Sequence, residues 1–206
     1  MDLFTFLLAV LLLELTPGPN MAYLAMLATL RGRVVGLIAV AGVAFGLAVH
    51  AVVAGLGAGV LLQQYPLLYD MVRWIGVGYL LYLAWDGWRT DRETSPERGD
   101  LVMMAGPLFL RGFLSNIFNP KSVLFFVSVL PTFVVTSPGA ASLPTQMTVL
   151  GTVYVGVATA VHATIVLIAA QLRPWLVEGP RQKIVRRVLS VVLALVAMWL
   201  AWTTRR

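Results

Sequence analysis

Residues 3–30 read LFTFLLAVLLLELTPGPNMAYLAMLATL, an apolar run that is broken near its middle by TPGPN at residues 16–20. A helix of about 20 apolar residues crosses the hydrocarbon core of a bilayer, and this run is long enough to do so. Proline removes a backbone donor and clashes with the preceding turn, so the two prolines that flank Gly18 predict a local opening of the helix. The run therefore predicts a membrane-spanning helix that is broken near its middle.

The rest of the chain has the same apolar character. Of its 206 residues, 59% are hydrophobic and 12% are charged, and the mean hydropathy is +0.86. Soluble domains carry about 25% charged residues, so this chain has too little polar surface to cover a water-soluble globule. It contains no cysteine, which excludes disulfides, thiolate metal sites and cysteine nucleophiles.

Five further apolar segments follow the first. They are residues 34–62, 66–88, 107–135, 147–172 and 188–202. We interpret all six as helices, because lipid-exposed backbone must satisfy its own hydrogen bonds and no short alternating barrel strands occur in the sequence. The predicted fold is an all-α integral membrane protein with six transmembrane helices, in one membrane domain over residues 1–206.

Basic residues predict the orientation of this domain. Eleven arginines and lysines lie in or beside the first, third and fifth links, whereas Arg73, Arg205 and Arg206 lie on the opposite side. The positive-inside rule places the first, third and fifth links in the cytoplasm and both termini outside. Because the net charge of +6 is concentrated in these links, we do not expect nucleic acid as a partner.

The first and fourth segments share a pattern. Both are long, and the fourth is also interrupted by polar residues beside a proline, at Asn116 and at Asn119-Pro120-Lys121. They lie three spans apart, so two three-helix repeats, residues 1–88 and 107–206 joined by a linker over 89–106, would insert in opposite orientations. Inverted repeats of this kind place a site where the two broken helices meet at mid-membrane.

The residues at the two breaks are candidates for substrate binding or translocation. They are Thr16, Pro17, Gly18, Pro19, Asn20, Asn116, Asn119, Pro120 and Lys121. A lysine at membrane depth costs about 2.5–3.5 kcal/mol on insertion scales, so it needs a counter-charge or water, and Glu14 is its natural partner. An ammonium group and a carboxylate held together would suit a zwitterion. The alternatives are structural: a packed kink at the first break, a lysine near a helix end, and hydrogen bonding between helices by the asparagines.

Other ionisable residues within or near the apolar segments have either a functional or a structural interpretation. Glu14 and His50 are candidates for proton coupling, because both lie within apolar segments and histidine titrates near neutral pH. For His162 we favour a hydrogen-bonded packing role. For Asp86, near a predicted interface, pairing with Arg89 or simple solvation is expected.

Small residues recur in the second segment. Gly42 and Gly46 are four residues apart, as are Gly55 and Gly59. Such spacing lets helices approach closely in membranes. The spacing therefore predicts tight packing of the second helix against a neighbour.

At these motifs the sequence resembles the LysE/RhtB family of amino-acid exporters, also called LysE-type translocators. The resemblance is carried by LTPGPNM at residues 15–21 and by GFLSNIFNPK at residues 112–121, which continues through Phe125-Phe126 and Leu130-Pro131. Gly42 through Gly46 to His50, and GYLLYLAW at residues 78–85, look like the family's second and third spans. The resemblance extends from about residue 5 to residue 200.

The resemblance implies a multi-pass exporter in a bacterial inner membrane that removes amino acids or their derivatives from the cytoplasm, with proton-motive force as the expected energy source. It assigns functional roles to residues 17–20 and 119–121, and His50 falls where the family often has histidine. Glu14, Asp86 and His162 have no support from the family pattern. The expected partners are a small-molecule substrate, protons and the lipid bilayer, and a homo-oligomer is compatible with them. No cofactor and no metal are expected.

Two other classes of protein are weighed against this interpretation. An intramembrane enzyme would need a catalytic constellation, and the best available pair is His50 with a serine such as Ser122 or Ser128, without an HExxH or GxSxG motif. An ion channel or metal transporter would favour rings of acidic residues, and only Glu14 is deep. We expect neither an enzyme nor a channel.

Overall fold

The computed structural model describes residues 3–57, 65–89, 98–176 and 181–203, and within these ranges all regular secondary structure is helical. Four helices are long and apolar enough to cross a membrane singly: α3 (Arg33–Gly55), α5 (Pro66–Arg89), α8 (Leu143–Gln171) and α10 (Arg181–Thr203). Two bent helix pairs bring the number of crossings to six. The predicted all-α membrane fold is therefore confirmed.

Each bent pair corresponds to one of the interrupted segments. The first consists of α1 (Leu3–Leu15) and α2 (Pro19–Arg31), which meet at 58°. In the second, α6 (Arg98–Ile117) is followed by α7 (Pro120–Leu124), the π-helix η1 (Phe125–Val129) and the 3₁₀-helix η2 (Leu130–Phe133), with a bend of 49°. A helix of 13 residues is only about 20 Å long, so neither α1 nor α2 spans a bilayer core of about 30 Å alone.

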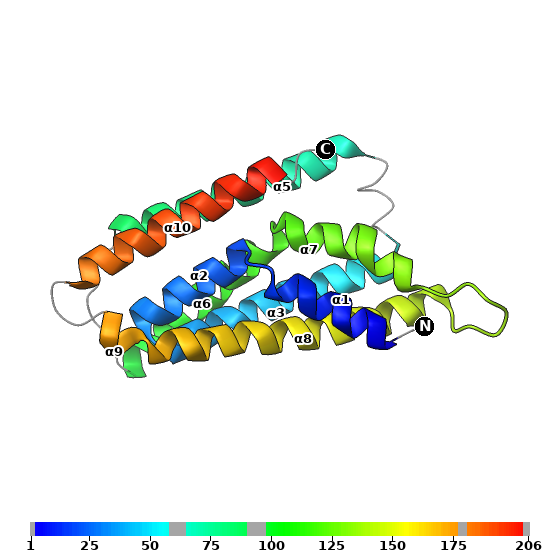
Figure 1. Ribbon diagram of the computed structural model, residues 1–206, viewed down its shortest axis with the longest axis horizontal. Helices are drawn as coiled ribbons and strands as arrows, with labels where there is room; N and C mark the ends of the chain where they lie inside the picture. The colour runs from blue at the N-terminus through cyan, green and yellow to red at the C-terminus, as the bar shows by residue number, and fades with distance from the viewer. Residues whose placement is uncertain (1–2, 58–64, 90–97, 177–180, 204–206) are drawn as a thin grey trace.

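Helices α2, α6 and α8 pack around α3, and α5 and α10 lie together at one edge of the molecule (Figure 1). Helix α3 packs against α6 and α8, and α2 packs against α8 and α3. Helix α10 lies beside α5 along one edge of the molecule and also contacts α2. The start of α1 and the end of α10 lie toward the same end of the bundle, as an even number of crossings requires (Figure 1).

Glycines allow α3 and α6 to pack backbone against backbone. A Cβ atom added at Gly42 would overlap the carbonyl oxygen of Phe109 in α6, and one added at Gly112 would overlap the carbonyl oxygen of Ala39 in α3. Gly46 of α3 faces Asn116 of α6. The predicted tight packing is thus confirmed for the first glycine pair. In the second pair Gly55 approaches Thr148, and Gly59 lies outside the described residues.

Several predicted boundaries are corrected by the structure. The fourth segment was expected to begin at Pro107, but α6 begins at Arg98 and contains this proline in its interior. The sixth segment was expected to begin at 188, but α10 already begins at Arg181. Hydropathy marks only the part of a helix that contacts lipid. A helix can continue beyond that part into the interface, because arginine is a good helix former and its long side chain can reach water.

The ends of two other spans also differ from the prediction. Helix α3 ends at Gly55, whereas the apolar segment continues to residue 62. Helix α8 begins at Leu143 instead of residue 147, because the Ser142 hydroxyl accepts a hydrogen bond from the Thr145 amide and Pro144 lies in the first turn. Serine at the cap and proline in the first turn are both favoured at a helix start.

An aromatic cluster joins the first bent pair to the second and to α8. The Tyr154 ring of α8 stacks on Phe125 of η1 with 3.9 Å between ring centroids, and Phe6 of α1 lies 6.3 Å from the same phenylalanine. All three residues are buried. Burial of such rings positions the tyrosine hydroxyl, which extends toward the break in the first span.

Candidate functional site

The break in the first span follows directly from its two prolines. Helix α1 ends at Leu15, and the Thr16 hydroxyl donates back to the Leu12 carbonyl at 3.0 Å. Pro19 is the first residue of α2, where its missing N–H costs nothing. Gly18 precedes it in an extended conformation, with φ −146°. The chain between the two short helices is therefore non-helical and leaves backbone groups in the middle of the span.

The break in the fourth span has the same construction. Helix α6 ends at Ile117, and the Asn119 side chain caps α7 by accepting a hydrogen bond from the Lys121 amide at 3.0 Å. Pro120 is the first residue of α7. In both breaks a proline thus opens the second helix, and a polar residue, Asn20 or Lys121, follows it.

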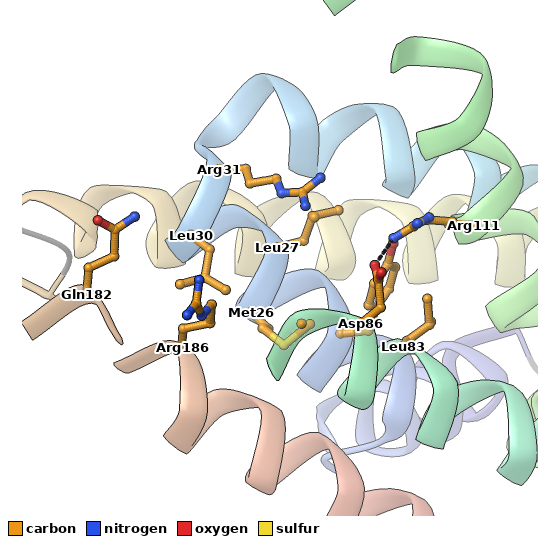
Figure 2. Close-up of a pocket in the computed structure, with 11 residues that line it drawn as sticks. Met26, Leu27, Leu30, Arg31, Leu83, Asp86, Arg111, Gln182 and Arg186 are labelled. Carbon is orange, nitrogen blue, oxygen red and sulfur yellow. Dashed lines mark hydrogen bonds and ion pairs between the residues drawn. The ribbon is translucent and has the colours of Figure 1, made fainter. Parts of the chain in front are cut away.

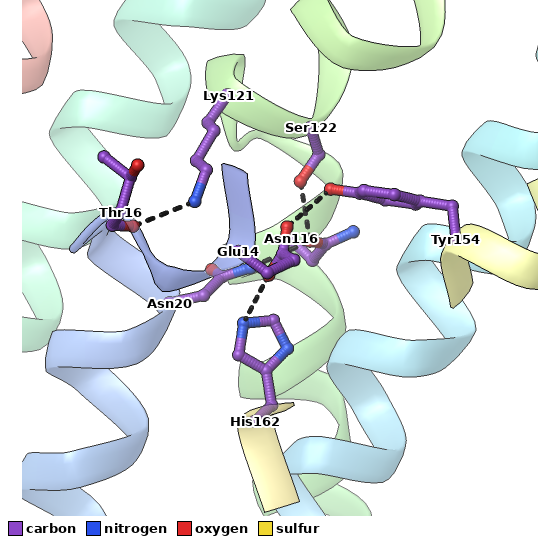
Figure 3. A network of polar contacts seen from close by, with 8 residues as sticks. All are labelled: Glu14, Thr16, Asn20, Asn116, Lys121, Ser122, Tyr154 and His162. Atoms are coloured by element: carbon purple, nitrogen blue, oxygen red, sulfur yellow. Dashed lines mark hydrogen bonds and ion pairs between the residues drawn. The ribbon is translucent and has the colours of Figure 1, made fainter. Parts of the chain in front are cut away.

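The two breaks lie against each other in the folded protein, as the sequence predicts (Figure 3). The Asn20 side-chain amide donates to the Asn116 side-chain oxygen at 2.8 Å, and the Ser122 hydroxyl donates to the same oxygen at 3.1 Å. All three side chains are buried. This amide cluster ties the start of α2 to both halves of the fourth span.

Lys121 bridges the two breaks. Its ammonium group donates to the carbonyl of Thr16, the residue that follows the end of α1, at 3.0 Å. The lysine side chain also passes Gly18, where an added Cβ would lie 3.5 Å from Cδ. The lysine is half-buried and lies in the first turn of α7, at the break and not at either end of the fourth span.

Glu14 is the buried carboxylate of this region, with 3% of its surface exposed. The Tyr154 hydroxyl donates to one carboxylate oxygen at 2.8 Å, and His162 Nε2 lies 3.5 Å from the other. Both partners come from α8 (Figure 3). The partner expected from the sequence was Lys121, but the ammonium group of that lysine binds the Thr16 carbonyl instead.

These residues surround a small cavity, which we call the central cavity. It is lined by Glu14, Gly18, Asn20, Met21, Leu47, Asn119, Lys121, Ser122 and His162. The cavity encloses about 250 Å³, including the part open to its surroundings, and its freely accessible part is about the size of one water molecule. A cation and a carboxylate therefore face one narrow polar space.

Six of the predicted residues are not in the lining of the central cavity: Thr16, Pro17, Pro19, Asn116, Pro120 and His50. Pro17 and the Thr16 side chain are exposed and border an apolar groove against Val192 and Trp199 of α10. His50 lies on α3 with its ring 5.8 Å from that of Phe126. Its expected alternative partner, Ser122, bonds to Asn116 instead, so no serine–histidine pair of a hydrolase is formed by these two residues.

Tyr154 and His162 were not among the residues predicted for the site. His162 was interpreted as a packing residue, but its ring nitrogen faces Glu14. A sequence signal was present: Leu150, Tyr154, Ala158, His162 and Val166 recur every four residues and are all buried. Residues four apart share one face of a helix, so a tyrosine and a histidine on the buried face of a membrane helix indicate a polar partner there.

The residues that the structure describes contain no group of three or more histidine, aspartate, glutamate or cysteine side chains that could hold a metal ion. The polar groups at the central cavity are instead one lysine, one glutamate, one histidine, hydroxyls and amides. Such a set binds organic ions through hydrogen bonds and charge pairing.

Comparison with known proteins points to one family. Residues 11–204 match the family described as LysE type translocator. The homoserine/homoserine lactone efflux protein of Salmonella typhimurium is 30% identical over 200 residues, which cover 96% of this chain and 95% of that protein. The leucine efflux protein of Salmonella choleraesuis is 32% identical over 143 residues, covering 67% and 66%. No solved structure matches.

Proposed function

The chain belongs to the LysE type translocator family, and from this we propose that it is a secondary active exporter of amino acids or amino-acid derivatives, coupled to protons. Membership of a translocator family makes it a transporter and not an enzyme. The names of its relatives, which specify efflux of homoserine, homoserine lactone and leucine, support this substrate class.

The observation that carries the proposal is the placement of Lys121 and Glu14 at one central cavity between two broken helices. The substrate carboxylate binds the lysine ammonium group, displacing the Thr16 carbonyl. The amides at the start of α2 contribute as well, because the N-terminus of a helix favours anions. Discontinuous helices form substrate sites in other secondary transporters in this way.

Proton coupling is assigned to Glu14 and His162. A proton on this pair and a substrate ammonium group compete for the same carboxylate, so binding of one disfavours binding of the other. Protonation from the outer side releases the substrate there. Substrate binding from the cytoplasm then expels the proton inward. This cycle exports one solute in exchange for inward proton movement. The histidine assigned to coupling is His162 and not His50, because His162 lies beside the Glu14 carboxylate whereas His50 packs against Phe126.

The proposed orientation in the bacterial inner membrane follows the positive-inside rule. The end of the bundle that carries Arg31, Arg33 and α9 (Arg173–Leu176) faces the cytoplasm, and both termini lie outside. Substrate therefore enters the cavity from the end at which α2 stops.

The function is tested with inverted membrane vesicles that contain the protein. We expect labelled L-leucine or L-homoserine to accumulate when the vesicle interior is made acidic, and a protonophore to abolish this accumulation. Transport of neither amino acid, or uptake that ignores the imposed gradient, would contradict the proposal.

The lysine supplies a matched pair of variants for the same assay, because the chain has only two lysines. Lys121→Ala removes the cation of the central cavity, and we expect it to abolish uptake while the protein remains in the membrane. Lys183→Ala removes an exposed lysine of α10, and we expect transport like that of the wild type. Full activity of Lys121→Ala would remove this residue from the mechanism.

A further inference from the structure

A second cavity lies where the end of α2 meets α5, α6 and α10 (Figure 2). We call it the basic pocket, because Arg31, Arg111 and Arg186 line it together with a single carboxylate, Asp86. It encloses about 520 Å³, including the part continuous with solvent. With three arginines and one carboxylate the described lining has a positive balance, which attracts anionic groups.

An ion pair between α6 and α5 divides this pocket. Arg111 donates to Asp86, as the dashed line in Figure 2 shows. The sequence had suggested Arg89 as the partner, but Arg89 lies over the Trp85 ring instead. The two side chains are 34% and 29% exposed, and ion pairs accessible to water contribute little net stability. The pair can therefore separate at small cost when other ions replace its members.

The Tyr23 hydroxyl supplies a second, independent observation. Tyr23 lines the basic pocket, is 2% exposed, and its hydroxyl has no hydrogen-bond partner among the described residues. A buried polar group without a partner is unfavourable, so native proteins normally provide one as a ligand or a water molecule. A buried hydroxyl in the lining of a basic pocket is suited to donate a hydrogen bond to a carboxylate.

The basic pocket and the central cavity lie along the same two helices. Tyr23 follows Asn20 by three residues on α2, and Arg111 precedes Asn116 by five residues on α6. At 1.5 Å per residue these separations are about 4.5 and 7.5 Å along the helix axes. A solute released from the basic pocket toward the bundle interior therefore arrives at the central cavity.

We propose that the basic pocket is a capture site for amino-acid zwitterions on their way to the central cavity. The substrate carboxylate binds Arg111 and the Tyr23 hydroxyl, and the substrate ammonium group takes over Asp86. A zwitterion thus inserts into the ion pair and leaves both protein charges compensated. A plain anion would offer no ammonium group to Asp86 in place of Arg111, and a plain cation would offer no carboxylate to Arg111 in place of Asp86, so a zwitterion is favoured over both.

This inference rests on the proposed function for its direction of transport and goes beyond it in assigning a second binding site. It is tested first by uptake of labelled L-leucine and L-homoserine into inverted vesicles. Arg111→Gln is expected to raise KM about tenfold, equivalent to about 1.4 kcal/mol of binding free energy, with little change in kcat. Tyr23→Phe raises KM less, and Arg111→Lys restores most of the affinity because it keeps the charge.

Arg89→Gln is the matched control, because it removes an arginine from the same end of the bundle outside the pocket. Its KM is expected to equal that of the wild type. Equal KM values for Arg111→Gln and Arg89→Gln would overturn the capture site. A lower kcat for Arg111→Gln with unchanged KM would overturn it too, because the ion pair would then serve structure or motion only.

Binding to the purified protein tests the site without transport. In Lys121→Ala, weak binding of labelled L-leucine or L-homoserine is expected to persist, and Arg111→Gln in the same chain is expected to abolish it. Unlabelled L-leucine competes, whereas L-leucinamide, which lacks the carboxylate, and 4-methylpentanoate, which lacks the ammonium group, compete poorly. Equal competition by either analogue would overturn the zwitterion assignment.

The two assays separate this inference from the proposed function. If vesicles fail to transport either amino acid while Arg111-dependent binding persists, the proposed function falls and the capture site stands. If transport is gradient-dependent and indifferent to Arg111→Gln, the capture site falls and the proposed function stands.

Discussion

Glu14 shows how one buried residue acquires a role through its neighbours. Its carboxylate lies between a tyrosine hydroxyl at 2.8 Å and a histidine nitrogen at 3.5 Å, all three side chains being buried. Ionisable residues within membrane helices are costly, and they usually mark ion or proton pathways. This arrangement is the reason for assigning proton coupling to Glu14 in the proposed cycle.

The Glu14→Gln variant tests this link. Glutamine keeps the shape and still accepts a hydrogen bond from Tyr154, but it cannot exchange a proton. We expect gradient-driven accumulation to fall by about tenfold or more, the effect of losing an interaction of about 1.4 kcal/mol. Exchange of labelled for unlabelled amino acid across the membrane needs no net proton movement and is expected to persist with a raised KM.

Tyr154→Phe serves as the control for Glu14→Gln, because it removes one hydrogen bond and leaves the carboxylate in place. Accumulation driven by a pH gradient is expected to survive in this variant. If Glu14→Gln accumulates amino acid as well as Tyr154→Phe does, Glu14 has no part in coupling.

At the scale of elements, the bundle depends on how closely α3 and α6 approach. A Cβ atom at Gly42 would overlap the backbone of Phe109 in α6. Backbone cannot move aside as a flexible side chain can. This crossing also positions Asn116, which Gly46 of α3 contacts. By allowing this close approach, the glycines determine the position of α6 and therefore of Asn116.

Substitution of Gly42 by alanine is expected to lower the stability of the protein. Overpacking of a close contact costs about 1–3 kcal/mol, so we expect Gly42→Ala to lose its folded, monodisperse form in detergent at a lower temperature than the wild type. Gly78→Ala is the control, because Gly78 of α5 has open space where its Cβ would lie. The measurement is size-exclusion chromatography after heating. If Gly42→Ala and Gly78→Ala lose their monodisperse peak at the same temperature, this explanation of the packing is refuted.

At the scale of the whole molecule, the two cavities lie along one helix. The basic pocket lies where α2 ends and the central cavity where α2 begins. One helix thus connects the proposed arginine-rich entrance with the central cavity. A rearrangement that opens the central cavity toward this entrance would give the inward-facing state of an alternating-access cycle.

The predicted orientation can be measured by thiol labelling, because the chain has no cysteine of its own. Ser137→Cys places a thiol in the exposed segment between η2 and α8, and Trp175→Cys places one at an 80% exposed position of α9 at the other end of the bundle. A membrane-impermeant maleimide should label the Ser137 variant in intact cells.

The Trp175 variant should react with the same reagent only in inverted vesicles. The reverse pattern would overturn the assigned orientation. Labelling of both variants in intact cells would show that the protein inserts in two directions.

Much of the architecture could be predicted because it depends on local properties of the chain. Long apolar segments, their number and the breaks at the Thr16–Asn20 and Asn119–Lys121 motifs follow from hydropathy and from the missing N–H of proline. Helix ends were predicted less well, as at Arg98 and Arg181, because the end of an apolar segment does not stop a helix of good helix formers.

The partners of the polar residues were decided only by tertiary structure. The sequence placed Glu14 at the first break but could not show that α8 would present Tyr154 and His162 to it, 140 and 148 residues later in the chain. Likewise, Asp86 pairs with Arg111 across two helices instead of with its near neighbour Arg89. Apolar patterning determines that a helix crosses the membrane, but the rotation of each helix, and therefore which charges meet, depends on close packing such as that of Gly42 and Gly112 between α3 and α6.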